Sequence, residues 1–485
     1  MATHGSESMG WWFPRMGRLM LAGCLAAGAF SAAGGTQPAW AQQSTKSKSG
    51  TATKGAGAGA AAPAGPAAPA GPAAGGAAKT GANAAGTKGA NPPGAQIKAS
   101  SKPAQVDEEN LDLLSGEEVG TFLESLGTAI DEGKLADFNR NIDWERISAV
   151  ASQGFQIPPK SKGKFLAEFR DPQDEETGFS GQVIKSATTG GSYALVKVHE
   201  VGRDVRALFR MVLPDDAGFN YHDYVIGRVD GKLKVVDIYI YGSGEMLSSM
   251  IRRAMIISAA HQAPEWLKGL QGRDLDMAKA GKMVKEYSDR AGRQDAEGCL
   301  ALYAKLPATV QKEKGVMLVR LYASTLIDDT TQQLALTELK KSDPRDFAGD
   351  LQCLPSYLSG QKYELFQKAI GRLKKEVGGD PYLNVVLADM HVAQQDYASA
   401  RKLLEEAIAA DDTLIDAWWA MVTVCLREQN YAQAVKTLDK LATDFQVDVG
   451  DVTRNAEYAD FVKSPEYQKW KKPKVAKTSG ETRVK

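Results

Sequence analysis

The chain has 485 residues, and its 59 Lys and Arg side chains balance 59 Asp and Glu, so the formal net charge is zero. This balance does not favour a nucleic-acid partner, because nucleic-acid-binding proteins concentrate positive charge. Beyond the N-terminal region no run approaches the ~20 apolar residues that a membrane-spanning helix needs, so we expect no transmembrane span in the mature chain.

The N-terminus has the order of an export signal. Arg15 and Arg18 precede a short apolar run, and an Ala-Trp-Ala triplet ends at Ala41. We therefore predict a signal peptide over residues 1–41 and an exported protein, periplasmic or at the cell surface. Lipid attachment at Cys24, which ends a Leu-Ala-Gly-Cys box, is the alternative, although the apolar run before it is short. A retained membrane anchor is a third interpretation.

Residues 42–106 consist almost entirely of Ala, Gly, Pro, Ser, Thr and Lys, with no aromatic side chain after Ser44. Such a segment buries too little surface to offset the entropy of ordering it, so we predict a disordered tether. We also predict a basic disordered tail over residues 471–485. These lysine-rich ends could contact the anionic cell envelope electrostatically, or they could simply keep the protein soluble.

A folded α+β domain is predicted over residues 107–255. Ser115 and Glu118 form a capping-box pattern, and apolar residues then recur at helical spacing, at Val119, Phe122, Leu123, Leu126 and Ile130. The stretch "DWERISAVAS", residues 143–152, predicts a second helix. These helices come before the first strand pattern, which is the order of an α+β domain rather than of alternating βαβ units.

Five segments then read as strands separated by turns: "GQVIKSA", "SYALVKVHEV", "DVRALFRMVL", "NYHDYVIGRV" and "KLKVVDIYIY". Asp230-Gly231 between the last two is a hairpin signal. Helices followed by a curled antiparallel sheet with an aromatic final strand resemble the nuclear transport factor two-like or cystatin-like cone. That resemblance implies a pocket, and some members are enzymes.

Polar pairs on these strands are the candidates for acid and base chemistry: His199 with Glu200, His222 with Asp223, and Asp237 with Glu245. Adjacent strand residues face opposite sides of a sheet, so adjacency alone cannot make His222 and Asp223 a dyad. Solvent-facing strand residues are the competing interpretation for each His. The chain contains no nucleophile elbow, phosphate-binding glycine loop or H-E-x-x-H motif, and we predict no catalytic, cofactor-binding or metal-binding residues.

Residues 256–470 are predicted to be helical repeats. "AQQDYASARKLLEEA" is echoed 34 residues later by "REQNYAQAVKTLDKL", which aligns Tyr397 with Tyr431 and Ala400 with Ala434. A 34-residue period of helix pairs resembles the tetratricopeptide repeat. The best units are 347–380, 381–414 and 415–448, and a weaker unit begins near Ala280. His391 and Cys425 stand where the family prefers Tyr.

Packing explains most of the repeated residues. Two antiparallel helices cannot bury their apolar faces alone, so such units stack, and the small Ala400 and Ala434 mark close helix crossings. The resemblance implies a groove lined by first-helix residues, which correspond here to Tyr382, Val385, Asp389, Trp419, Thr423 and Arg427. Trp418 takes the packing position, which leaves Trp419 for the groove; burial of Trp419 under the C-terminal segment "FVKSPEYQKW" is the alternative.

The sequence therefore predicts a non-catalytic scaffold of the cell envelope that binds a protein or peptide. An enzyme or small-molecule receptor in the cone pocket, or a cell-wall-binding structural protein, are the alternatives. Cys299, Cys353 and Cys425 each stand in an apolar context, which is typical of buried cysteines.

The predicted tether is testable by limited proteolysis. Flexible segments are cut first, so trypsin should trim the chain to a stable product that begins near Asp107. N-terminal sequencing or mass spectrometry of the product identifies this end. Protection of the stretch from Lys54 to Lys98 would contradict the prediction.

Overall fold

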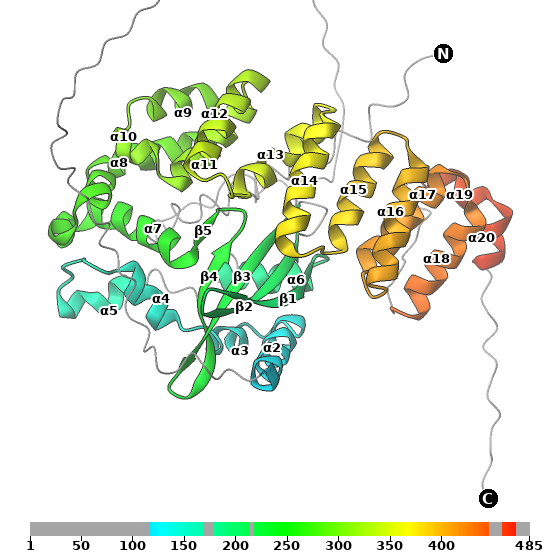
Figure 1. Ribbon diagram of the computed structural model, residues 1–485, viewed down its shortest axis with the longest axis horizontal. Helices are drawn as coiled ribbons and strands as arrows, with labels where there is room; N and C mark the ends of the chain where they lie inside the picture. The colour runs from blue at the N-terminus through cyan, green and yellow to red at the C-terminus, as the bar shows by residue number, and fades with distance from the viewer. Residues whose placement is uncertain (1–115, 168–177, 214–217, 446–457, 472–485) are drawn as a thin grey trace, which may run out of the picture. The chain divides into compact units, whose positions relative to one another are not determined.

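The computed structural model describes residues 116–167, 178–213, 218–445 and 458–471. The predicted signal peptide, the tether and nearly all of the basic tail lie outside these ranges, as does Ser115 of the predicted capping box. Within them, helices and a small antiparallel sheet are followed by a long series of helices (Figure 1). The predicted order, an α+β part and then an all-α part, is confirmed.

Short helices come before the sheet, as predicted. In α2 (Gly116–Asp131) the five apolar residues at helical spacing are all buried. The second predicted helix is α4 (Trp144–Ala151), whose N-cap Asp143 accepts a hydrogen bond from the Arg146 amide at 3.0 Å. Two further helices are α3 (Leu135–Arg140) and α5 (Pro159–Ala167).

The sheet is a meander in which each strand pairs antiparallel with the next (Figure 1). Its strands are β1 (Ser192–Val201), β2 (Asp204–Val212), β3 (Phe219–Val229), β4 (Lys232–Ile240) and the short β5 (Glu245–Met246). Asp230 and Gly231 connect β3 to β4 with φ values of 48° and 77°. Positive φ at both positions is what a two-residue hairpin turn requires, so the predicted hairpin is confirmed.

The first of the five predicted strands is wrong. "GQVIKSA" belongs to helix α6 (Phe179–Thr188), which contacts β1 and β2. Its buried residues Ser180, Val183 and Ser186 recur every three positions, which is a helical spacing. A short apolar run is ambiguous between helix and strand, and here packing against the sheet decides for the helix.

Both faces of the sheet are buried. One face contributes Ala207, Phe209 and Tyr224 to a core shared with α2 and α4. The opposite face contributes Leu208 and Tyr221 to a second core, shared with helices of the all-α part. The sheet therefore lies between two helical layers and is joined to the repeats through an apolar interface.

The all-α part packs directly against the α+β part that precedes it. Helix α7 (Leu247–Gln262) crosses the predicted domain boundary at 255/256. The helices that follow are η5 (Pro264–Gly269), α8 (Gly272–Gly292), α9 (Ala296–Tyr303), α10 (Ala308–Gln311), α11 (Lys314–Thr325), α12 (Asp329–Ser342), α13 (Ala348–Ser359), α14 (Tyr363–Val377), α15 (Tyr382–Ala393), α16 (Tyr397–Ala410), α17 (Ile415–Arg427), α18 (Tyr431–Thr443), α19 (Ala459–Lys463) and α20 (Pro465–Trp470).

Helix pairs α11/α12, α13/α14, α15/α16 and α17/α18 keep a 34-residue register. The residues that precede the second helix of these pairs are Asp328, Lys362, Asp396 and Asn430. Except for Lys362, each of these side chains accepts a hydrogen bond from the amide three residues on. Asp295 does the same in the pair α8/α9, which supports the weaker unit predicted near Ala280.

The turn inside four of these pairs places a glutamine in the left-handed region. Gln294, Gln361, Gln395 and Gln429 have φ between 54° and 62°. The next residue then donates its amide to a carbonyl five positions back, as Asp396 does to His391 at 2.9 Å. This common geometry shows that the four turns are structurally equivalent.

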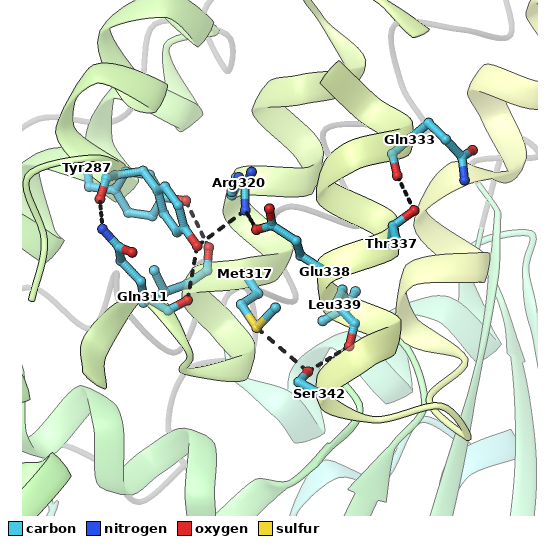
Figure 2. Close-up of polar contacts among 11 residues, drawn as sticks. Tyr287, Gln311, Met317, Arg320, Gln333, Thr337, Glu338, Leu339 and Ser342 are labelled. Carbon is cyan, nitrogen blue, oxygen red and sulfur yellow. Dashed lines mark hydrogen bonds and ion pairs between the residues drawn. The ribbon is translucent and has the colours of Figure 1, made fainter. Parts of the chain in front are cut away.

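Polar contacts join neighbouring pairs toward the N-terminal end of the array. Figure 2 shows Arg320 of α11 directed at Glu338 of α12, with which it forms an ion pair. The Arg320 guanidinium also lies over the ring of Tyr303 from α9, 4.6 Å from its centroid. One side chain thus connects helices of two successive pairs.

The left-handed turn allows a test at Gln395. A non-glycine residue in this region is strained, so Gln395→Gly should raise the free energy of unfolding by about 0.5–1 kcal/mol. The matched control is Gln394→Gly, because Gln394 has helical dihedrals, with φ −81° and ψ −4°. That change should instead lower the free energy of unfolding by a similar amount. Effects of the same sign in urea titrations would show that the turn geometry is not as described.

Candidate binding surface

The six predicted groove residues lie on α15 and α17, the first helices of two successive pairs. They differ in what covers them. The side chains of Tyr382 and Val385 pack against other parts of the chain. Asp389, Trp419 and Thr423 are half-buried, and Arg427 is exposed.

Tyr382 is covered by the sheet. The guanidinium of Arg210, from β2, lies 4.9 Å from the centroid of its ring, and Phe219 of β3 packs edge-on against it at 5.6 Å. The aromatic face that would receive a ligand is therefore already used in an intramolecular contact.

The prediction for Val385 is wrong. Its side chain is 5% exposed and belongs to the core of the last two pairs, which also contains Ala388 and Leu404. It therefore offers no surface to a partner. Val385 lies on α15, and the packing of α15 against the neighbouring repeat helices buries its side chain.

The two adjacent tryptophans of α17 have separate roles. Trp418 packs against Phe445 and donates its indole N–H to the Asp412 carbonyl at 2.9 Å, as expected for the packing position. Trp419 packs partly against the same core and stays half-buried. The C-terminal helices α19 and α20 place Phe461 against Tyr431 of α18, at 5.7 Å.

A buried ion pair attaches the sheet to the start of α15. Arg210 donates to one carboxylate oxygen of Asp380 at 2.6 Å, and the Tyr221 hydroxyl donates to the other at 2.8 Å. The Asp380 side chain also accepts the Tyr382 amide at 3.1 Å. Side-chain exposure is 6% for Arg210 and 1% for Asp380. All of these donors converge on one carboxylate, which compensates for its removal from water.

The preceding repeat carries a matching carboxylate. Asp346, 34 residues before Asp380, accepts the Ala348 amide at 3.1 Å and pairs with Lys314 at 2.8 Å. The turn after β4 approaches it so closely that a Cβ at Gly244 would clash with its carboxylate. Two consecutive repeats thus present a buried aspartate where the sheet meets the first helix.

Sequence reasoning missed Arg210, Phe219 and Tyr221 as contacts of the repeats. One signal was available: Arg210 is a charged residue within the otherwise apolar stretch "ALFRMVL", which covers most of β2. Such a residue needs a buried partner. Its partner is 170 positions away, so local pattern could not identify it.

The candidate acid and base residues of the sheet form contacts with partners other than the ones considered in the sequence. His222 and Asp223 point to opposite faces, as predicted. His222 Nδ1 lies 2.9 Å from the Tyr193 hydroxyl, and burial lowers the pKa of His222 to about 3. Asp223 contacts His199 at 2.9 Å instead.

Asp237 and Glu245 do not pair with each other. Asp237 accepts the Ser248 hydroxyl at 2.5 Å and the Ser248 amide at 3.1 Å at the start of α7, and burial raises the pKa of Asp237. Glu245 forms a two-bond contact with Arg253. These carboxylates therefore stabilise the junction of β4, β5 and α7.

The three cysteines outside the N-terminal region are buried and free, as expected. Burial raises the pKa of Cys299 to about 12, that of Cys353 to about 11, and that of Cys425 as well. Thiols of this kind stay protonated and unreactive at neutral pH. Among the described residues, His, Cys, Asp and Glu nowhere gather into a group that could hold a metal ion. No helix in the described ranges is long and apolar enough to cross a membrane.

The attachment of sheet to repeats is testable through Arg210. Arg210→Met leaves Asp380 buried without its cation, so the free energy of unfolding should fall by about 3–5 kcal/mol. Adding Asp380→Asn should recover part of this loss, because the uncompensated charge is removed. Lys368→Met is the control, since Lys368 forms an exposed pair with Glu364 and should change stability by less than about 0.5 kcal/mol. A loss below about 1 kcal/mol for Arg210→Met in urea unfolding would contradict this account.

Comparison with known proteins supports the repeat assignment. A family model described as tetratricopeptide repeat matches residues 391–452, from the end of α15 through α18. No curated protein and no solved structure matches the chain significantly. The match covers α16, α17 and α18, and the helix pairs from α11 to α18 recur at 34-residue spacing, so the all-α part contains a tetratricopeptide-type repeat region.

Proposed function

We propose that this protein is a non-catalytic scaffold that is exported to the periplasm or cell surface and binds a protein or peptide through its repeats. The observation that carries the proposal is the recurrence of helix pairs at 34-residue spacing, together with the family match over the last of them. Repeats of this kind expose successive first helices along one surface, and such surfaces commonly bind other proteins.

The binding surface that we propose lies on the last two helix pairs. It comprises Asp389, Trp419, Thr423 and Arg427. Tyr382 is left out because the sheet covers it, and Val385 is left out because it is buried in the core. Aromatic and arginine side chains are enriched among the residues that dominate binding energy, which favours Trp419 and Arg427 as anchors.

Packing inside the α+β part favours this scaffold over the enzyme alternative. Large side chains of the sheet and of α2 pack into one apolar core, among them Phe122, Leu126, Phe209 and Tyr224. The histidines there are committed to Tyr193 and Asp223. A wall-binding role would depend on the lysine-rich segment, which lies outside the described residues; salt-sensitive sedimentation with cell-wall fragments would reveal it.

Two substitutions separate packing from binding within the repeats. Ala400 is fully buried, so Ala400→Glu should lower the free energy of unfolding by at least about 3 kcal/mol through overpacking and charge burial. Trp419→Ala should leave most of the stability intact and weaken partner binding by roughly 2 kcal/mol or more. The measurements are thermal unfolding and titration of the full chain with a partner captured from an envelope extract.

The outcome depends on which property each variant loses. If Trp419→Ala unfolds the repeats as badly as Ala400→Glu, then Trp419 is a core residue and the proposed surface is wrong. If Trp419→Ala is stable and binds the captured partner as well as the unmodified chain does, then the partner uses another surface.

A further inference from the structure

A buried histidine lies at the centre of a hydrogen-bonded network on one face of the sheet. His222 of β3 is 4% exposed, and its Nδ1 lies 2.9 Å from the Tyr193 hydroxyl. That hydroxyl lies 2.6 Å from the hydroxyl of Tyr224. On the other side of the ring, Nε2 lies 3.4 Å from the side-chain nitrogen of Asn220. These four residues are called the His222 network below.

Two backbone amides fix the orientation of Asn220. Its side-chain oxygen accepts the amide of Tyr221 at 2.8 Å and the amide of Gly242 at 2.7 Å. The side-chain nitrogen, which can only donate, is therefore the atom that faces His222 Nε2. Because Nε2 has to accept, the single proton of the neutral imidazole lies on Nδ1 and is donated to Tyr193. The network thus fits a neutral histidine.

A protonated His222 does not fit the same partners. An N–H at Nε2 would face the N–H groups of Asn220, so two donors would oppose each other. Within the described part of the chain, the neighbours of the ring from α6, β1, β2, β3 and β4 carry no charge: Phe179, Tyr193, Phe209, Asn220, Tyr224 and Ile240. Asp223 lies on the opposite face, where it contacts His199. Burial without a counter-charge lowers the pKa of His222 to about 3.

The same segment of β3 holds the repeats. Asn220 and His222 belong to the network on one face, whereas Phe219 and Tyr221 alternate with them on the other face. Phe219 packs against the ring of Tyr382, and the Tyr221 hydroxyl donates to the buried carboxylate just before α15. A change in the backbone of this segment therefore reaches both the network and the attachment to α15.

We propose that the His222 network is an acid-sensitive switch, in which protonation of the imidazole loosens the attachment of the sheet to the repeats. At neutral pH the neutral ring holds this segment of β3 in place. On acidification the ring takes up a proton only by losing its contact with Asn220. The segment then opens, and the contacts of Phe219 and Tyr221 at α15 open with it.

The direction of the pH effect follows from proton binding. The ordinary pKa of histidine is 6.5, and that of His222 in the fold is about 3. Between these values the unfolded state binds more protons, so the stability linked to His222 is complete above about pH 6.5 and declines as the pH falls. The ratio of folded to unfolded chain should therefore drop about tenfold or more through His222 between pH 7 and pH 5.

Three carboxylates act in the opposite direction. Burial raises the pKa of Asp237, Glu313 and Asp346, so their protonation favours the fold as the pH falls. They are present in every variant compared below, and their contribution cancels in the comparison.

The first test compares urea unfolding of the full chain at pH 7 and pH 5. His222→Gln replaces the titrating ring with a neutral amide. The folding equilibrium constant of the unmodified chain should fall about tenfold more between the two pH values than that of His222→Gln. The matched control is His261→Gln in the last turn of α7, where the side chain is exposed. This variant should keep the pH dependence of the unmodified chain.

The second test locates the change by hydrogen–deuterium exchange at the same two pH values, with labelling times scaled to the intrinsic exchange rate. In the unmodified chain, peptides that cover residues 219–224 and 380–385 should lose protection at pH 5. In His222→Gln both should stay protected. Residues 431–443 of α18, which are remote from the sheet in sequence, serve as the internal reference and should not change.

An equal pH dependence of the unmodified chain and His222→Gln would overturn the proposal. Unchanged protection of residues 380–385 in the unmodified chain at pH 5 would also overturn it, because the attachment would then be insensitive to acid. This second result needs no variant. If His222→Gln loses its helical circular dichroism at pH 7, His222→Asn takes its place and should show the same reduced pH dependence.

Discussion

The buried ion pair between Arg210 and Asp380 is the contact on which the arrangement of sheet and repeats depends. Removing two charges from water is costly, and close ionic and hydrogen-bonding partners offset that cost. Asp380 receives Arg210, the Tyr221 hydroxyl and the Tyr382 amide. Such a set has directional requirements that an apolar interface lacks, so it fixes which strand meets which repeat. The apolar core around Leu208 and Tyr221 then contributes the bulk of the burial.

This attachment determines which part of the repeat surface is open. Because Arg210 and Phe219 contact the Tyr382 ring, that residue is used inside the chain, and the binding surface that we propose lies beyond it on α15 and α17. The repeats thus carry two kinds of position: those that hold the sheet and those that stay accessible.

The titratable residues of the sheet form hydrogen bonds and ion pairs with one another and with neighbouring side chains. His222 is neutral because burial depresses its pKa, and it contacts the Tyr193 hydroxyl. Asp223 on the opposite face contacts His199 and Arg206. Each of these side chains therefore has a structural partner within the α+β part.

The sequence by itself determined the features that depend on near neighbours in the chain. The 34-residue period located the helix pairs, because helix capping and close crossings at Ala400 and Ala434 repeat with it, and Asp230-Gly231 located a hairpin through its backbone conformation. Only the tertiary structure decided that "GQVIKSA" is helical, that Val385 is buried and that Arg210 meets Asp380. In each of these cases the deciding energy comes from burial against residues distant in sequence, and a local pattern carries no information about which distant residues those will be.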